Sequence, residues 1–374
     1  MKWSWKLGRV FGIDLFIHAT FVLLLGWVAV SAYLRERNAH AMVVGVAFML
    51  AIFGSVLLHE LGHALTAKRF GIRTRDITLL PIGGVARLER MPEKPGQELL
   101  VALAGPAVNV VIALALVGVL LATGQPLRSD GSTVAAAGPF FTRLLWVNVT
   151  LAVFNLLPAF PMDGGRALRA VLAFRGDYVR ATQMAAKLGQ GIALLLGILG
   201  LFVNPMLVFI ALFVWIGAGA EAAGVEAKAS VQGIPVTAAM QTDFRVLSTH
   251  DTLGTAALRL LGGSQVDFPV VDADGALVGV LTRANLIGGL SEQSAEAFVG
   301  SVMERHFVTA HPAEMLEVAM GRLQECACGA IPVVDEAERV VGMLTATNIG
   351  ELMMVRDALR TSSRKHPALE LAPR

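Results

Sequence analysis

The apolar positions of this chain follow two different patterns along its length. Up to about Glu221 they form long runs that are separated by short polar and basic segments. Beyond Gly233 the apolar stretches are short, alternate with polar residues and carry interspersed charges. Runs of about 20 apolar residues can cross a bilayer as helices, whereas short alternating runs are typical of strands in a soluble domain. The pattern therefore predicts a membrane-spanning part followed by a soluble part.

Six runs in the first part qualify as membrane helices. They cover residues 10–33, 41–65, 98–122, 140–157, 185–203 and 205–220. Between the second and third runs lies a weakly alternating segment, 76–89, with Gly83 and Gly84 at its centre. This segment is predicted to form a β-hairpin or a re-entrant loop, apolar enough to touch lipid or to line a cavity.

The basic residues predict how the helices are oriented. Lys and Arg are concentrated before the first run, after the second and after the fourth, while the opposite loops hold few. Because cytoplasmic loops carry an excess of Lys and Arg, both termini and the soluble part are expected in the cytoplasm. The chain is thus predicted to be a multi-pass protein of the cell membrane.

Composition agrees with this picture. Hydrophobic residues make up 55% of the chain and charged residues 16%, well below the roughly 25% charged residues of a soluble domain. The formal net charge of +2 gives no reason to expect a nucleic acid partner. The two cysteines, Cys326 and Cys328, are separated by one residue and are predicted to be buried thiols rather than a disulfide.

The second apolar run ends in the sequence HELGH, which contains His59, Glu60 and His63. On a helix, two histidines at i and i+4 share one face and can bind the same Zn²⁺, and the glutamate between them can take a proton from the attacking water. The alternative is that this combination of residues occurs by chance at the end of a helix and has no function. Ionisable residues inside a membrane helix are costly and usually mark function, which favours a zinc site.

A third ligand is expected in NLLPAFPMDGGR, residues 155–166. Asp163 is predicted to lie at the end of the fourth helix, where two prolines before it and two glycines after it make the backbone irregular. Taken alone, Asp163 is better explained as a helix-end residue beside a glycine turn. Asn155 lies deeper in the helix, and its amide could donate to an oxyanion or form an interhelical hydrogen bond.

The two motifs together resemble the site-2 protease family of intramembrane zinc metalloproteases. AGPAVN, residues 104–109, is similar to the third-helix motif of that family, and the segment around Gly83 and Gly84 resembles its membrane-embedded strand region. The resemblance covers about residues 10–222. It implies that His59, His63 and Asp163 are zinc ligands and that Glu60 is the general base. It also implies that Asn155 contacts the substrate or the oxyanion.

The family cleaves transmembrane segments of membrane-tethered proteins, so the resemblance implies regulated intramembrane proteolysis. Substrates would then be membrane proteins with a single transmembrane segment, within the lipid bilayer. An unwound substrate segment is expected to pair with the strand near Gly83 and Gly84. The competing interpretation is a membrane transporter or channel gated by the soluble part, because charged residues and broken helices suit that function too.

The soluble part contains an internal repeat. FPVVDADGALVGVLTRANLI at 268–287 matches IPVVDEAERVVGMLTATNIG at 331–350, an offset of 63 residues. This resembles a tandem cystathionine-β-synthase (CBS) pair, which implies an α/β regulatory module. Many such pairs bind ATP or another adenine nucleotide, so the polar positions shared by the repeats are candidate contacts: Thr282, Asn285, Thr345 and Asn348. Asn285 and Asn348 stand where nucleotide-binding units usually have Asp, so a docking module or a homodimer interface remains an alternative.

The predicted architecture is a polytopic α-helical membrane domain of about six transmembrane helices with a membrane-embedded β-hairpin, followed by an α/β tandem CBS domain. The expected boundaries are 1–222 for the zinc metalloprotease domain, 223–233 for a linker, 234–360 for the CBS pair, with units at 234–292 and 297–356, and 361–374 for a disordered tail.

Overall fold

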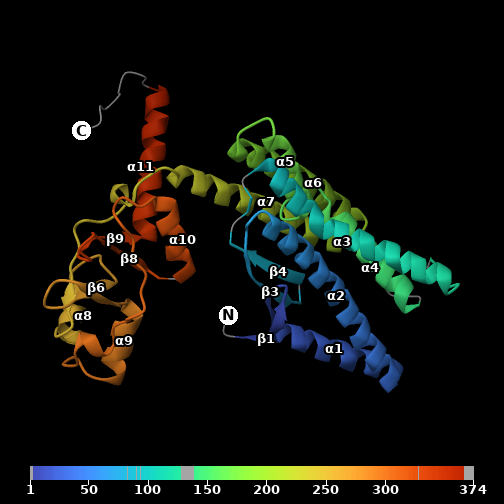
Figure 1. Ribbon diagram of the computed structural model, residues 1–374, viewed down its shortest axis with the longest axis horizontal. Coiled ribbons are helices and arrows are strands. Elements are labelled where there is room, and N and C mark those ends of the chain that lie inside the picture. Colours follow the sequence, from blue (N-terminus) through green and yellow to red (C-terminus); the bar gives the residue numbers. More distant parts are fainter. Residues whose placement is uncertain are drawn as a thin grey trace. The chain divides into compact units, whose positions relative to one another are not determined.

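The computed structural model describes residues 3–81, 83–89, 91–92, 94–127, 139–326 and 328–365. The chain divides into two compact units, Met1–Val225 and Glu226–Arg374. In Figure 1 the first unit is a group of long helices with a small sheet, and the second combines short helices and strands. The two units therefore differ in the way that the hydrophobic pattern predicts.

The first unit consists mainly of helices. Its elements are β1 Ser4–Val10, β2 Ile13–His18, α1 Ala19–Glu36, α2 Ala39–Arg69, β3 Thr74–Leu80, β4 Gly83–Leu88, α3 Pro95–Ala122, α4 Phe140–Asn155, α5 Asp163–Ala173, α6 Tyr178–Phe202 and α7 Met206–Val231. Among the described residues, α1, α2, α3, α6 and α7 are long and apolar enough to cross a membrane, and α4 is a shorter apolar helix. The prediction of about six membrane helices thus corresponds to five long helices and one short one.

The first membrane helix begins later than predicted. Helix α1 starts at Ala19, and the residues before it form the antiparallel strands β1 and β2, joined by a turn at Gly12 with φ of 88°. The prediction of a helix from Val10 was therefore wrong for its first part. In β2, Ile13 and Leu15 are buried and the residue between them is not, which is the period of a strand. The apolar run had concealed this alternation.

The small sheet has the strand order β1-β2-β3-β4, with β2 and β3 parallel and the other pairs antiparallel. Strands β3 and β4 form a hairpin in the segment 76–89. Because β4 begins at Gly83, Gly83 and Gly84 open the second strand instead of lying at the centre of the turn. Ile77 of β3 packs against Leu61 of α2, so the sheet is fixed to that helix. The depth of the hairpin in a membrane stays a prediction.

Helices α2 and α3 approach each other closely. A Cβ at Gly62 of α2 would lie 2.8 Å from the backbone oxygen of Ala104 in α3. Small residues at such a contact let two helix backbones come together. Toward the other end of the helices, α2, α3 and α4 share an apolar cluster that contains Phe48, Ala113, Leu116, Leu120, Leu144 and Leu145. These contacts pack α2, α3 and α4 against one another.

The second unit is built from two copies of one arrangement. Its elements are η1 Val236–Ala238, β5 Leu247–Ser248, α8 Leu253–Leu261, β6 Phe268–Val271, β7 Leu277–Leu281, α9 Arg283–Glu292, η2 Val299–Ser301, α10 Leu316–Cys326, β8 Ala330–Val334, β9 Val340–Thr345 and α11 Ala346–Lys365. The pairs η1 and η2, α8 and α10, β7 and β9, and α9 and α11 each begin 63 residues apart. The repeat seen in the sequence is confirmed.

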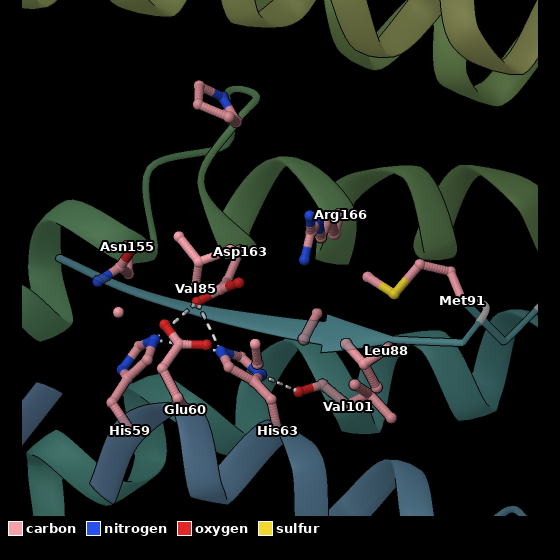
Figure 2. Close-up of a pocket in the computed structure, with 14 residues that line it drawn as sticks. His59, Glu60, His63, Val85, Leu88, Met91, Val101, Asn155, Asp163 and Arg166 are labelled. Atoms are coloured by element: carbon pink, nitrogen blue, oxygen red, sulfur yellow. Dashed lines mark hydrogen bonds and ion pairs between the residues drawn. The ribbon is translucent and has the colours of Figure 1, made fainter. Parts of the chain in front are cut away.

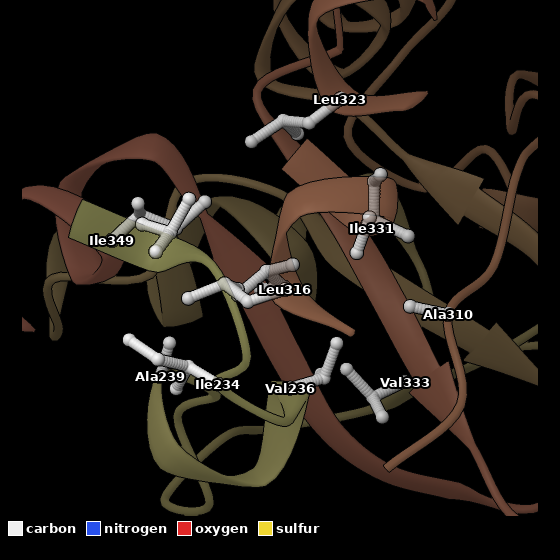
Figure 3. Close-up of a cluster of buried hydrophobic side chains, with 12 residues drawn as sticks. Ile234, Val236, Ala239, Ala310, Leu316, Leu323, Ile331, Val333 and Ile349 are labelled. Atoms are coloured by element: carbon white, nitrogen blue, oxygen red, sulfur yellow. The ribbon is translucent and has the colours of Figure 1, made fainter. Parts of the chain in front are cut away.

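Each repeat is completed by the segment that precedes the other one. Met240, ahead of the first repeat, lies against Gly342 in β9, and Met303, ahead of the second, lies against Gly279 in β7. A Cβ at either glycine would lie within 2.8 Å of a methionine sulfur. The core drawn in Figure 3 follows this exchange and contains Ile234, Val236, Ala239, Ala310, Leu316, Leu323, Ile331, Val333 and Ile349. The two repeats therefore depend on each other for a complete core.

Helices extend across two segments that were predicted to be less ordered. Helix α7 continues to Val231, so most of the predicted linker 223–233 is helical. Helix α11 continues to Lys365, and residues 366–374 of the predicted tail lie outside the described residues. The first and second units are thus joined by a continuous helix.

Cys326 and Cys328 are bonded to each other, with an S–S distance of 2.12 Å. The prediction of two thiols is contradicted. Helix α10 ends at Cys326, and the Cα atoms of Cys326 and Cys328 are 5.1 Å apart. This Cα separation lies in the usual range for a disulfide, which a single intervening residue does not prevent.

Candidate metal centre

Two histidines on α2, one helical turn apart, form the centre of the site. His59 and His63 are each 7% exposed, and their Nε2 atoms lie 3.1 Å apart. Residues at i and i+4 lie on the same face of a helix, so the spacing of the motif accounts for their approach. Figure 2 shows both rings directed toward the carboxylate of Asp163.

The third side chain of the site comes from α5. Asp163 is the first residue of that helix, and its Oδ2 lies 3.2 Å from Nε2 of His59 and 3.1 Å from Nε2 of His63. The prediction placed Asp163 at the end of the fourth helix, but a non-helical segment separates that helix from α5. This segment folds back tightly, since a Cβ at Gly164 would lie 2.3 Å from the backbone oxygen of Leu157.

The three donor atoms fit a zinc ion. They all lie within 4.8 Å of one another and form a candidate metal cluster in the described part of the chain. Two imidazoles and one carboxylate leave a fourth coordination position open, as in catalytic zinc sites. Gly105 of α3 faces the rings, and a Cβ there would lie 2.2 Å from Nε2 of His63 and 2.6 Å from Nε2 of His59. A glycine at this position keeps the space between the donor atoms clear.

Each histidine is also held by its other ring nitrogen. Nδ1 of His63 lies 2.7 Å from the backbone oxygen of Val101, and Nδ1 of His59 lies 2.6 Å from Oδ1 of Asn109. Such partners orient a metal-binding imidazole and leave Nε2 free for the ion. The role of Asn109 was missed by sequence reasoning, which placed it only in the third-helix motif. An isolated Asn in a long apolar helix is the signal that could have indicated it.

Glu60 lies beside the three donors and lines a cavity of about 230 Å³. Figure 2 shows Glu60 between the two histidines, with β4 passing close by. A Cβ at Gly84 would lie 2.8 Å from Cγ of Glu60, so this part of β4 is in direct contact with the glutamate. The cavity is also lined by His59, His63, Val85, Ala86, Leu88, Met91, Val101, Ala102, Asn155, Pro161, Asp163 and Arg166. Strand β4 therefore borders the same cavity as Glu60.

Asn155, Arg166 and the two glycines at the start of β4 are placed differently with respect to this cavity. Asn155 lines it and donates from Nδ2 to the backbone oxygen of Leu151, 3.0 Å away in its own helix. Arg166 lines it as well and was not predicted. Of the two glycines at the start of β4, Gly84 lines the cavity, whereas Gly83 is the strand's first residue, with φ of 139°.

The four residues expected at a nucleotide site begin two equivalent helices of the second unit. The Thr282 hydroxyl accepts from the backbone N–H of Asn285 at 3.1 Å, and Thr345 accepts in the same way from Asn348 at 3.1 Å. Asn285 Nδ2 donates to the backbone oxygen of Val302, and the Thr345 hydroxyl donates to Asn348 Oδ1. Thr282 also lines a cavity of about 360 Å³, together with Val266, Asp267, Arg283, Ala284, Cys328 and Gly329. Asp267, Arg283 and Cys328 had not been predicted there.

Comparison with known proteins gives matches to both parts of the chain. The sequence model of peptidase family M50 matches residues 47–133 and 127–199, and that of the CBS domain matches 236–292 and 299–354. A zinc metalloprotease of Methanocaldococcus jannaschii is 32% identical over 358 residues, which cover 95% of this chain and 97% of that protein. The residues of the candidate metal centre lie inside the first pair of matched segments.

Two solved structures are also similar. A site-2 protease from Methanocaldococcus jannaschii is 35% identical, covers 59% of this chain and 95% of that chain, and has a TM-score of 0.42. The protein CBSX2, solved in complex with AMP, is 25% identical, covers 35% of this chain and 99% of that chain, and has a TM-score of 0.30.

Proposed function

We propose that this chain, which belongs to peptidase family M50, is an intramembrane zinc endopeptidase that cleaves transmembrane segments of membrane-tethered proteins. The observation that carries the proposal is the convergence of two histidines and an aspartate beside Glu60, among helices apolar enough to cross a membrane. Ionisable groups among such helices are costly and mark function. A transporter or channel would give Glu60 no chemical role, and membership of the family favours the protease.

The residues of the centre divide the chemistry among them. His59, His63 and Asp163 would hold the zinc ion, which when bound polarises the scissile carbonyl and makes water more acidic. Glu60 takes a proton from the water as the water oxygen attacks the carbonyl carbon. It then gives this proton to the amide nitrogen as the C–N bond breaks. The products are a carboxyl end and an amino end, and Glu60 returns to its carboxylate form.

Asn155 is proposed to stabilise the oxyanion that forms during attack. One hydrogen of its Nδ2 is directed to the backbone oxygen of Leu151, and the second remains to be donated. Asn155 lines the same cavity as Glu60, on the side of α4. A hydrogen bond to a developing negative charge in a dry site is worth more than the same bond in water.

Strand β4 is proposed to bind the substrate. It is the last strand of its sheet, with β3 as its neighbour, and Gly84, Val85 and Ala86 line the cavity. A transmembrane helix keeps its amides in internal hydrogen bonds, so it must unwind before hydrolysis. The unwound segment can then pair with an exposed strand edge. Gly83, at the start of β4, remains a proposed contact, and the proposed substrate is a protein with a single transmembrane segment.

The membrane arrangement is also part of the proposal. The distribution of Lys and Arg supports a multi-pass protein of the cell membrane whose two termini and CBS pair are cytoplasmic. His63 lies five residues before Lys68 and six before Arg69, the basic residues that end α2. The metal centre would then be close to the cytoplasmic face, and water would have a short route to it.

The CBS pair is proposed to regulate cleavage through α7, the helix that continues from the first unit into the second. A Cβ at Gly217 of α7 would lie 2.6 Å from Cδ of Pro161, two residues before Asp163. A shift of α7 would therefore move the segment that leads to Asp163, a proposed metal ligand. An adenine nucleotide would change activity only by binding two states of the pair unequally. A homodimer through the CBS pair is the alternative role.

The proposal is tested by comparing membrane-protein fragments in cells that carry the wild-type chain or Glu60→Gln. Glu36→Gln, at the exposed end of α1, is a matched control because it makes the same change away from the site. Fragments cut within a transmembrane segment should be present with wild type and the control and absent with Glu60→Gln. The same fragments in all three would contradict an endopeptidase that uses Glu60.

A further inference from the structure

We infer that Asn148 is a positioning residue of the metal centre, which acts through Asn109 to keep His59 in the tautomer that binds metal. The inference rests on the zinc site of the proposed function. Asn148 and Asn109 are both 0% exposed and lie in the interiors of the apolar helices α4 and α3. A buried amide is costly unless its polar groups are bonded, so the partners of these two residues are informative.

A continuous path of hydrogen bonds connects three helices. His59 Nδ1 of α2 lies 2.6 Å from Asn109 Oδ1 of α3. Asn109 Nδ2 donates to Asn148 Oδ1 of α4 at 3.0 Å. Asn148 Nδ2 in turn donates to the Ser55 hydroxyl at 3.2 Å, which returns the path to α2 one turn before the histidine.

Two backbone carbonyls set the direction of this path. Asn148 Nδ2 also donates to the backbone oxygen of Leu144 at 2.9 Å, and the Ser55 hydroxyl donates to that of Ala51 at 3.2 Å. A carbonyl oxygen can only accept, so Asn148 must turn its Nδ2 toward Leu144 and its Oδ1 toward Asn109. Asn109 must then present its own Nδ2 to Asn148, which leaves its Oδ1 for the histidine.

The amide oxygen of Asn109 determines the tautomer of His59. Of the two neutral tautomers, only the one with a proton on Nδ1 can donate to that oxygen, and its lone pair is on Nε2. Nε2 is the atom that faces Asp163 and His63. For His63 a single contact fixes the same tautomer, because its Nδ1 faces the backbone oxygen of Val101. Nδ1 of His59 faces the side-chain oxygen of Asn109 instead, so its tautomer depends on the two amides.

Without Asn148, the Asn109 amide would be free to turn over. Its NH₂ group would then face Nδ1 of His59 and favour the tautomer with a proton on Nε2, and that nitrogen could then no longer bind the metal ion. Loss of a group that orients a metal ligand typically reduces metal affinity by about 10–100-fold. The effect of Asn148 should therefore appear in zinc affinity, although Asn148 does not touch the ion.

The first test measures the zinc dissociation constant of the purified full-length chain by competition with a chelator. Asn148→Leu should weaken zinc binding about 10-fold or more. Thr142→Val is the matched control, because Thr142 lies on the same helix, is also 0% exposed, and donates to the backbone oxygen of Pro126, outside the path. It should leave zinc affinity unchanged. Equal zinc affinity in Asn148→Leu and wild type would overturn the inference.

The second test repeats Asn148→Leu in an Asn109→Asp background. A carboxylate has an acceptor oxygen on either side, so Asp at position 109 accepts from His59 whichever way it is turned. Asn148→Leu should then have little further effect on zinc affinity. Equal losses in both backgrounds would show that Asn148 acts only through packing, and the inference would fall. Wild-type protein that binds no zinc would instead contradict the proposed function itself.

Discussion

Arg169 of α5 and Glu221 of α7 form an ion pair in which Nη1 lies 2.7 Å from Oε1. Nε of the same arginine donates to Glu98 of α3 at 2.7 Å, and both Arg169 and Glu98 are 1% exposed. The guanidinium also lies over the rings of Phe160 and Tyr178. Because Asp163 begins α5, this arginine ties the helix that bears a metal ligand to two of its neighbours.

Replacement of the arginine should destabilise the fold. Arg169→Met leaves Glu98 buried without its partner, and removal of one member of a buried ion pair costs about 3–5 kcal/mol. The double variant Arg169→Met with Glu98→Gln should recover part of this loss, because the uncompensated charge is gone. Denaturant unfolding in detergent measures the difference. If the single and double variants were equally stable, the buried charge would not be the cause.

Substitution of Gly105 should remove the metal without removing a ligand. Gly105→Ala places a methyl group where the donor atoms of His59 and His63 lie, at 2.6 and 2.2 Å. Gly118→Ala is the control, because it makes the same change on α3 at a position where the new Cβ would face open space. Metal analysis should find zinc in the control and little in Gly105→Ala. Full zinc occupancy in both would place the ion elsewhere.

Asp163 is predicted to be the third zinc ligand. Asp163→Ala should lower both zinc content and cleavage, since two histidines alone hold the ion weakly. Asp177→Ala is a suitable control: Asp177 caps α6 through the backbone N–H of Arg180, so its loss costs about 1 kcal/mol of stability without touching the site. Asp163→Ala that retains tightly bound zinc would show that the third ligand is another residue.

The CBS pair is predicted to bind an adenine nucleotide at the cavity lined by Thr282. Calorimetric titration of ATP into the full-length chain should give binding that Thr282→Val weakens. Thr252→Val is the control, because Thr252 caps α8 in the same way, through the backbone N–H of Thr255. Both variants lose a helix cap. A difference in ATP affinity between them would therefore come from a contact between Thr282 and the nucleotide. If ATP gave no heat of binding with the wild-type chain, the CBS pair would not be a nucleotide site. It would then be a docking or dimer module.

The elements with a strong local period could be predicted from the sequence, and those set by long-range contacts could not. HELGH gives its geometry directly, because a helix brings His59 and His63 to one face. The repeat likewise predicted the elements of the second unit. The exchange of Met240 and Met303 between repeats was not visible, since sequence similarity assigns each segment to the repeat that follows it.

The path behind His59 shows the same limit within the site. Asn109 is 50 residues from His59 and 39 from Asn148 along the chain. No spacing rule connects residues so far apart on different helices. The strand β2 was missed for another reason: its alternation lies next to a long apolar helix, and the two patterns merge into one run. Asp163 was predicted because prolines and glycines mark an irregular segment around it. Its position at the start of α5 was not predicted.

The most direct test of the proposed function is zinc content and cleavage of purified Glu60→Gln, measured on the same reconstituted protein. The variant keeps His59, His63 and Asp163, so it should bind one zinc per chain as wild type does. It lacks the group that moves the proton, and general-base catalysis typically contributes about 10²–10⁴-fold. Cleavage of a transmembrane substrate should therefore fall at least about 100-fold with zinc unchanged. Near-normal cleavage by zinc-loaded Glu60→Gln would contradict the account.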